Sequence, residues 1–267
     1  MISLEELCEK TNTKRAIKIL STLKNLGVKP NIQGFTRSSS YRPFSSKVPY
    51  IGNNIIAKLP KEGKEKILIS AHYDKVSKGQ GVIDNGCAVY QILELMEYLR
   101  DHPANVDITC AFFDCEENGL IGSTHFVKKN QDKFESVFNL DLTGTGDTLF
   151  LPSHSSYNYF GDTNKIRIMD PKLNQRLQTV CTNNNIPHYC GGEYGGSDHI
   201  PFLDADIPAT SISILPKNSV TPILTSKDYR YNFSDMIHTP RDNLSQVDSN
   251  AMQMMQDLLI GLIKSYE

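Results

Sequence analysis

The sequence predicts an α/β fold in three layers, in which helices cover both faces of a central mixed, mostly parallel sheet of about eight strands. Short apolar runs of strand length alternate with longer amphipathic segments through the middle of the chain. This alternation is typical of parallel sheets that are covered on both faces. The chain has 267 residues, 39% of them hydrophobic, so it can bury a sizeable core. We expect one domain over residues 1–267, with residues 1–50 forming a helix and a loop that pack on the core.

Each element follows from the spacing of its apolar residues. Within residues 1–30, apolar side chains from Ala16 to Leu26 recur at helical spacing, and Gly27 then ends the helix. Residues 33–49 are polar and rich in Ser and Arg, which predicts a loop or an edge strand. Buried strands are predicted at 66–71, 108–113, 137–142 and 209–215, and helices at 88–99, 122–129, 173–182 and 251–264.

Composition narrows the range of partners. A formal net charge of -2 gives no basic footprint for nucleic acid, and no stretch approaches the roughly 20 apolar residues of a membrane span. Residues 1–10 carry three glutamates and no apolar region of the kind found in a secretory signal, so we expect a cytoplasmic protein. The six cysteines show no CxxC spacing and are expected to be free thiols. The sequence does not specify an oligomeric state.

Acidic residues and histidines stand where the predicted strands end or the helices begin. Ligands of such sheets bind beyond the carboxyl ends of the strands, so these side chains are expected at one rim. Taken singly, each has an ordinary explanation, such as a structural histidine or an aspartate that caps a helix. The set comprises His72 and Asp74 after the first strand, Asp84 before a helix, Glu116 and Glu117 after the second strand, Asp141 in the third, and His238 in a late loop.

Imidazole nitrogens and carboxylate oxygens together form a ligand set that suits zinc, with cobalt or manganese as substitutes. Three carboxylates of this set and its two imidazoles together are more ligands than one catalytic zinc takes. They are enough for two ions if one carboxylate bridges the two. The adjacent glutamates allow a division of roles, because neighbouring side chains at a strand end point in different directions. One can bind metal while the other acts as a general base towards water.

Six sequence blocks follow one another along the chain in a fixed order. They are AHYD (71–74), GVIDNG (81–86), FFDCEENGLIGS (112–123), NLDLTG (139–144), YGGSDHIPF (194–202) and IHTPRDN (237–243). In these blocks, which span roughly residues 67–248, the chain resembles the co-catalytic zinc aminopeptidases, family twenty-eight of the metallopeptidases. That family includes bacterial leucyl aminopeptidases and is related to the glutaminyl-peptide cyclotransferases.

The resemblance implies a function and a role for each residue. It implies the zinc-dependent exopeptidase fold and removal of N-terminal residues from peptides with a free N-terminus, by a hydroxide that bridges two Zn²⁺ ions per chain. His72 and Asp141 would bind one ion, Glu117 and His238 the other, and Asp84 both. Glu116 would be the general base, and Asp74 would orient His72.

Two further features follow from the resemblance. The peptide bond Asp84–Asn85 is expected in the cis form, as often in the family. Tyr194 stands three residues before the block Ser197-Asp198-His199, the spacing at which some relatives place a tyrosine that donates to the developing oxyanion. A packing role for Tyr194 is the alternative. Asp198 and His199 are expected to support the site rather than bind metal.

A glutaminyl-peptide cyclotransferase is the main alternative, with a single zinc bound by Asp84, Glu117 and His238 and pyroglutamate as the product. The short segment from Glu117 to Gly122, the block Asp84-Asn85-Gly86 and the lack of tryptophan favour the peptidase. A non-catalytic binding domain of the same fold is disfavoured, because such members lose ligands and this chain keeps them. For a carboxypeptidase or dipeptidase, nothing in the sequence places a basic pocket for the substrate carboxylate.

Overall fold

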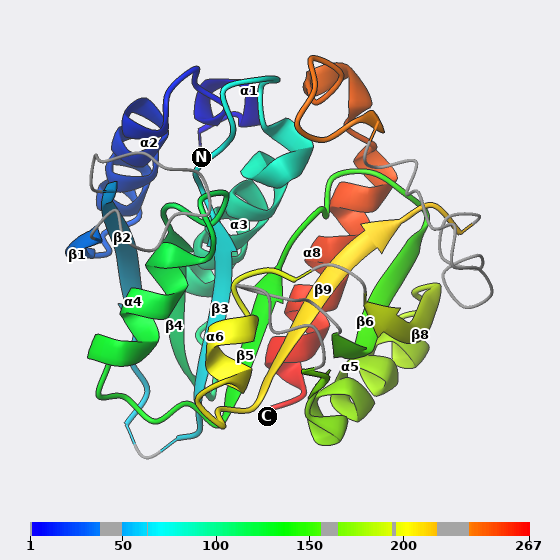
Figure 1. Ribbon diagram of the computed structural model, residues 1–267. Coiled ribbons are helices and arrows are strands. Elements are labelled where there is room, and N and C mark those ends of the chain that lie inside the picture. Colours follow the sequence, from blue (N-terminus) through cyan, green and yellow to red (C-terminus); the bar gives the residue numbers. More distant parts are fainter. Residues whose placement is uncertain (1, 38–49, 63, 156–164, 194–195, 218–234) are drawn as a thin grey trace.

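A computed structural model of the chain describes residues 2–37, 50–62, 64–155, 165–193, 196–217 and 235–267 (Figure 1). Nine strands of the described residues form one mixed sheet in the order β1-β2-β4-β3-β5-β9-β6-β7, with β8 paired to β6. Their bounds are β1 Asn31–Arg37, β2 Tyr50–Leu59, β3 Lys66–His72, β4 Asp107–Phe113, β5 Ser136–Leu140, β6 Thr148–Ser155, β7 Arg167–Ile168, β8 His188–Glu193 and β9 Ala209–Leu215.

The centre of the sheet is parallel, and antiparallel pairings flank it on both sides. Strands β4, β3, β5 and β9 run in the same direction as neighbours, and β6 and β8 are also parallel. The pairs β1–β2, β2–β4, β6–β7 and β6–β9 are antiparallel. The central parallel strands are buried on both faces: every residue of β5 and of β9 is buried, as is typical of parallel strands covered by helices on both sides.

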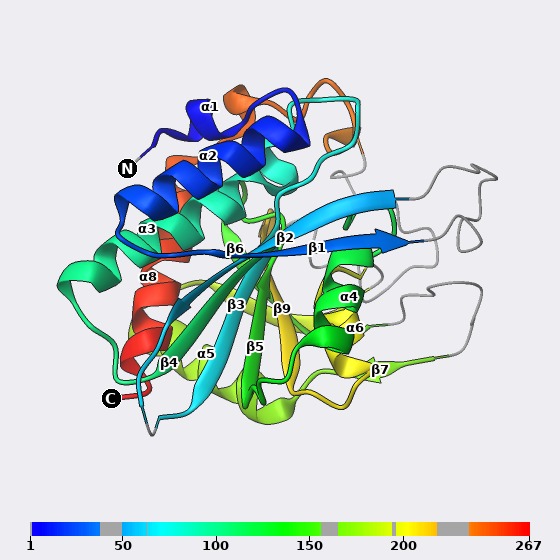
Figure 2. The ribbon, with the colours of Figure 1, turned by 90° about the vertical axis from the view of Figure 1, so that its left-hand side faces the viewer.

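Helices cover both faces of the sheet and complete the three layers (Figure 2). The side chains of α2, α3, α5 and α8 share one hydrophobic cluster with the sheet, whereas those of α4 and α6 join a second cluster on the opposite face. The predicted α/β fold class is therefore confirmed. The helices are α1 Leu4–Leu7, α2 Asn12–Asn25, α3 Cys87–Asp101, α4 Ile121–Lys129, α5 Pro171–Asn183, α6 Ile200–Leu203 and α8 Ser249–Lys264, with the short turns η2 Val82–Gly86 and η6 Leu244–Gln246.

The predicted strands and helices are all present, with bounds that differ by a few residues. The N-terminal helix is two helices, because Ser3 caps α1 and Thr11 caps α2 separately. Gly27 ends α2 with φ 75°, as expected of a glycine at that position. Of the segment 33–49, for which a loop or an edge strand is predicted, residues 33–37 belong to the edge strand β1, and residues 38–49 lie outside the described residues. Among the described residues, no helix is both long and apolar enough to cross a lipid bilayer.

The strands β2, β6, β7 and β8 are not predicted by the sequence. β7 has only two residues. In the other three strands, polar residues, glycine or proline interrupt the apolar residues: Gly-Asn-Asn in β2, Pro-Ser-His in β6 and Gly-Gly in β8. These strands hold their places through pairing with their neighbours rather than through a strong pattern of their own.

Candidate metal centre

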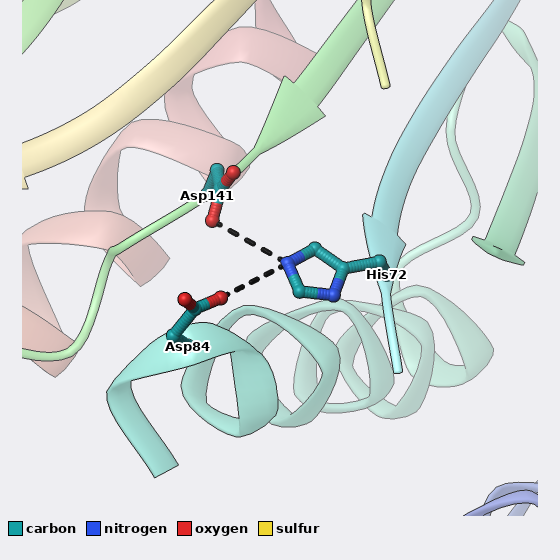
Figure 3. Close-up of side chains that lie close together, drawn as sticks. All are labelled: His72, Asp84 and Asp141. Carbon is teal, nitrogen blue, oxygen red and sulfur yellow. Dashed lines mark ion pairs between the residues drawn. The ribbon is translucent and has the colours of Figure 1, made fainter. Parts of the chain in front are cut away.

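Three predicted ligands converge at the carboxyl ends of the central strands (Figure 3). His72 is the last residue of β3, Asp141 follows β5, and Asp84 lies in η2 at the start of α3. The Nε2 atom of His72 lies 3.1 Å from Oδ1 of Asp84 and 3.7 Å from Oδ1 of Asp141. Because β3 and β5 are parallel neighbours, their carboxyl ends lie at the same rim of the sheet, which brings His72 close to Asp141.

A second group forms on the other oxygen of Asp84. Its Oδ2 atom lies 3.1 Å from Nε2 of His238, which in turn lies 2.9 Å from Oε2 of Glu117. In each group of three residues the candidate ligand atoms lie within 4.8 Å of one another. The two groups therefore share Asp84, with one carboxylate oxygen directed at each histidine.

The donor atoms fit a cation. Oε1 of Glu117 and Oδ1 of Asp141 are buried and have no hydrogen-bond partner among the described residues. A buried carboxylate oxygen without a partner is costly, and a metal ion is one of the few species that would satisfy it. Two imidazoles and three carboxylates are ligands that zinc accepts, and two groups of three are enough for two ions.

Exposure differs between the two groups. The side chain of His72 is 1% exposed, whereas that of His238 is 50% exposed. Asp84 and Glu117 are each 8% exposed. The site is therefore closed around His72 and open to solvent beside His238.

Asp74 connects the histidine with the glutamate pair. The Nδ1 atom of His72 lies 3.1 Å from the main-chain oxygen of Asp74 and 3.5 Å from its carboxylate. The same carboxylate accepts hydrogen bonds from the main-chain N–H groups of Glu116 at 3.0 Å and Glu117 at 3.2 Å. Asp74 is therefore placed to turn Nε2 of His72 towards Asp84, and it also fixes the backbone of both glutamates.

Two residues without an assigned role hold the ligand backbone. The Asp84–Asn85 peptide bond is cis, as expected from the resemblance. The Asn85 side chain donates to the Leu140 carbonyl at 2.8 Å and accepts from the Leu142 N–H at 3.3 Å, on either side of Asp141. The Asp242 carboxylate accepts from the N–H groups of Val82 and Ile83, both at 2.8 Å. Asn85 lies in the block GVIDNG and Asp242 in the block IHTPRDN, but the spacing of residues in these blocks does not predict that either side chain binds the backbone near a ligand.

Charge crowding shifts the acid–base behaviour of the site. Burial raises the pKa of Glu116 well above its usual value, and Asp198, Asp141 and Glu117 raise it further, against the opposing effect of His72. Burial alone would lower the pKa of His72, but Glu116, Asp141, Asp74 and Asp84 raise it well above the usual value. Burial also raises the pKa of Asp198 to about 7. All three shifts favour the protonated form of the group, as expected where buried carboxylates crowd together.

The remaining predicted residues lie outside the two groups. Tyr194 is outside the described residues. Asp198 and His199 are fully buried, and Nε2 of His199 lies 3.1 Å from Oε2 of Glu193. Neither Asp198 nor His199 belongs to a group of three candidate ligands among the described residues.

Comparison with known proteins identifies the family. The model of Peptidase family M28 matches residues 54–263. The chain is 26% identical over 220 residues to "Aminopeptidase YwaD" of Bacillus subtilis, which covers 79% of this chain and 44% of that protein. It is 27% identical over 151 residues to "Leucine aminopeptidase 2" of Trichophyton rubrum, which covers 54% of this chain and 29% of that protein. The chain thus spans less than half the length of these curated relatives.

Solved structures share the fold. A zinc aminopeptidase from Bacillus subtilis superposes with a TM-score of 0.76 at 16% identity, covering 98% of this chain and 93% of that one. A glutaminyl cyclase from Porphyromonas gingivalis superposes with a TM-score of 0.74 at 20% identity, covering 95% of this chain and 89% of that one. At these identities the likeness concerns the fold alone, and it does not distinguish the two activities.

The arrangement predicts a protonated His238 in the metal-free protein. Hydrogen bonds with Asp84 and Glu117 raise its pKa from 6.5 to about 10. Since the folded-state pKa is the higher one, protonation stabilises the fold fully below about pH 6.5, and this contribution is lost as the pH rises towards 10. We expect NMR of the imidazole in chelator-treated protein to show a titration midpoint well above 6.5, and Glu117→Gln to lower it. A midpoint near 6.5 in the unsubstituted protein would contradict this prediction.

Proposed function

This chain belongs to Peptidase family M28, and from that membership we propose that it is a zinc metallo-aminopeptidase that hydrolyses N-terminal residues from peptides. The observation that carries the proposal is the pair of candidate ligand groups that share Asp84. A single catalytic zinc takes three protein ligands. Two ions therefore call for two groups of three ligands, and the two groups in this protein have one residue in common. The names of the curated relatives, which are aminopeptidases, support the same activity.

In the proposed centre, His72, Asp84 and Asp141 hold one Zn²⁺, and Asp84, Glu117 and His238 hold the other. Zinc bound there would supply the Lewis acidity that polarises a scissile carbonyl and lowers the pKa of water. The protein would hold the five ligand side chains in place around the two ions. Asp74, Asn85 and Asp242 contribute to this by binding the backbone next to the ligands.

Glu116 is the proposed general base. It stands next to a proposed ligand, and the Asp74 carboxylate holds its backbone N–H. Burial and nearby carboxylates raise its pKa, which makes its carboxylate a stronger base than that of an ordinary glutamate. In its carboxylate form, such a base can take a proton from water and pass it to the leaving amine. We assign Tyr194 as the donor to the developing oxyanion.

The proposed substrate is a peptide with a free N-terminus. Its ammonium group requires acidic partners near the metals, and Glu116 and Asp141 would receive it. The exposed side of the site beside His238 leaves room for a peptide to approach. We also propose the cytoplasm as the compartment, in keeping with six cysteines that are all free thiols.

A glutaminyl-peptide cyclotransferase is the second candidate function. The observation that favours it is that Asp84, Glu117 and His238 form a complete three-ligand group without His72 and Asp141. In that case one zinc would be held, and N-terminal glutamine would be converted to pyroglutamate with loss of ammonia.

Mass spectrometry of two short peptides, one beginning with Leu and one with Gln, tests both functions. We expect zinc-loaded protein to remove whole residues stepwise from the N-terminus. If the Gln peptide loses only ammonia and the Leu peptide is unchanged, the protein is a cyclotransferase and the aminopeptidase proposal is wrong.

Replacing Glu116 by Gln should leave the zinc content unchanged and reduce kcat by about 10²- to 10⁴-fold, because the base is removed while the shape is kept. Glu62→Gln, in an exposed turn, is the matched control and should keep full activity. Steady-state kinetics together with metal analysis measures the effect. Turnover of Glu116→Gln within a few-fold of the unsubstituted enzyme would rule out the base assignment.

Replacing Asp141 or His72 by Ala should lower the zinc content by about one ion per chain, because the group of Asp84, Glu117 and His238 stays whole. Asp101→Asn, whose side chain is 63% exposed, is the control for the aspartate. Elemental analysis of dialysed protein gives the stoichiometry. An unchanged stoichiometry in the Asp141 and His72 variants would indicate a centre that holds a single metal ion.

A further inference from the structure

The connection between His72 and Asp84 has no regular secondary structure over residues 73–81. This connection joins two proposed ligands of the same metal ion. The distance between these two ligands therefore depends on the contacts that hold the connection in place. Its own contacts are few: the Lys75 side chain donates to the carbonyls of Val76 at 2.8 Å and Gly79 at 3.1 Å. The contacts that fix its two ends come from elsewhere in the chain.

Arg15, in helix α2, supplies several of those contacts, and it reaches both ends of the connection. Its guanidinium donates to the carbonyl of Tyr73 at 3.3 Å, at the start of the connection, and to that of Gly81 at 2.8 Å, at its end. It also donates to the Gln80 carbonyl and, through Nε, to the Glu9 carbonyl at 3.2 Å. One side chain thereby ties residue 73, next to His72, to residues 80 and 81, just before Asp84.

The environment of Arg15 is unusual for an arginine. The residue is 2% exposed, and its four hydrogen bonds to described residues all go to main-chain carbonyls. Removing a charged side chain from water is costly, so a buried charge is normally paired or hydrogen-bonded. The planar fork of the guanidinium can satisfy several acceptors in fixed directions, which an ammonium cannot do.

The N-terminal helices fit closely against the same loop. A side chain at Gly86 would place its Cβ 2.5 Å from Sγ of Cys8, and one at Gly81 would place it 2.7 Å from Cβ of Lys75. Asn12 accepts a hydrogen bond from the Lys75 N–H at 3.2 Å. Asp242 binds the following N–H groups of Val82 and Ile83. Both the N-terminal helices and Asp242, near the C-terminus, therefore bind the backbone of the connection and of the turn that follows it.

We infer that Arg15 is a positioning residue of the metal centre, which sets the place of Asp84 relative to His72 by tying the two ends of the loop between them. The inference rests on the proposed zinc function. It extends the centre to a residue outside the 54–263 range that the family model matches. Arg15 touches no proposed ligand side chain through its hydrogen bonds and acts through the backbone alone.

Zinc affinity of the metal-free protein, measured by competition with a chelating indicator, tests this inference. Arg15→Met keeps an unbranched stem but loses the guanidinium and its donors, and we expect zinc binding to weaken about 10- to 100-fold, as for other residues that orient metal ligands. Arg15→Lys keeps the charge but not the fork, and it should weaken binding at least about threefold. Lys14→Met, on the same helix with a side chain that is 62% exposed, should bind zinc within about twofold of the unsubstituted protein.

The outcomes separate a positioning role from a structural one. A purely structural role would lower the unfolding temperature of the metal-free and zinc-loaded forms equally, and zinc affinity would not change. A positioning role reduces the rise in unfolding temperature that zinc produces. Zinc affinity of a folded Arg15→Met protein within twofold of the unsubstituted protein overturns the inference. If Arg15→Met does not fold, Arg15→Lys decides by the same criterion. If the unsubstituted protein binds no zinc, the proposed function fails as well.

Discussion

The carboxylate of Asp84, held between two histidines, is the interaction on which the rest of the site depends. Its two oxygens face Nε2 of His72 and Nε2 of His238, each at 3.1 Å. His72 is carried by a central strand and His238 by a loop more than 160 residues further along the chain. Only a fold that places the rim of the parallel strands beside that loop can bring both imidazoles to one carboxylate. The parallel pairing of β3 with β4 and β5 sets that rim, and Asp242 ties the late loop to the turn that carries Asp84.

Electrostatics explain why the site carries so many contacts to the main chain. Asp74, Asp84, Glu116, Glu117, Asp141 and Asp198 influence one another's charge or that of His72, and burial raises the pKa of several of them. Repulsion among close carboxylates would push them apart in a flexible loop. Short hydrogen-bonded links to Asn85, Asp242 and Arg15 fix the backbone on which these groups stand, so the charges stay close enough to share cations.

The sequence was sufficient for the central strands, the main helices and the proposed ligands, because these leave periodic or positional signals. Residues 66–71 and 137–142 read as buried strands, and His72 and Asp141 stand at their ends. The strands β2, β6 and β8 were missed since they rely on their neighbours for pairing. Asn85, Asp242 and Arg15 could not be assigned roles, because contacts from a side chain to a distant backbone leave no spacing in the sequence. Arg15 in particular reads as one more basic residue on an amphipathic helix, and only the fold shows that it is buried.

The sharing of Asp84 also bears on how such a protein can diverge. Loss of His72 or Asp141 leaves the other three-residue group whole, whereas loss of Asp84 leaves neither group whole. In the proposed two-ion centre, a single substitution on the buried side would therefore leave a one-ion centre, with the solvent-facing group inherited unchanged. For such a centre the number of ions is an evolvable trait, and the aspartate common to both groups is the position that selection would hold most strictly.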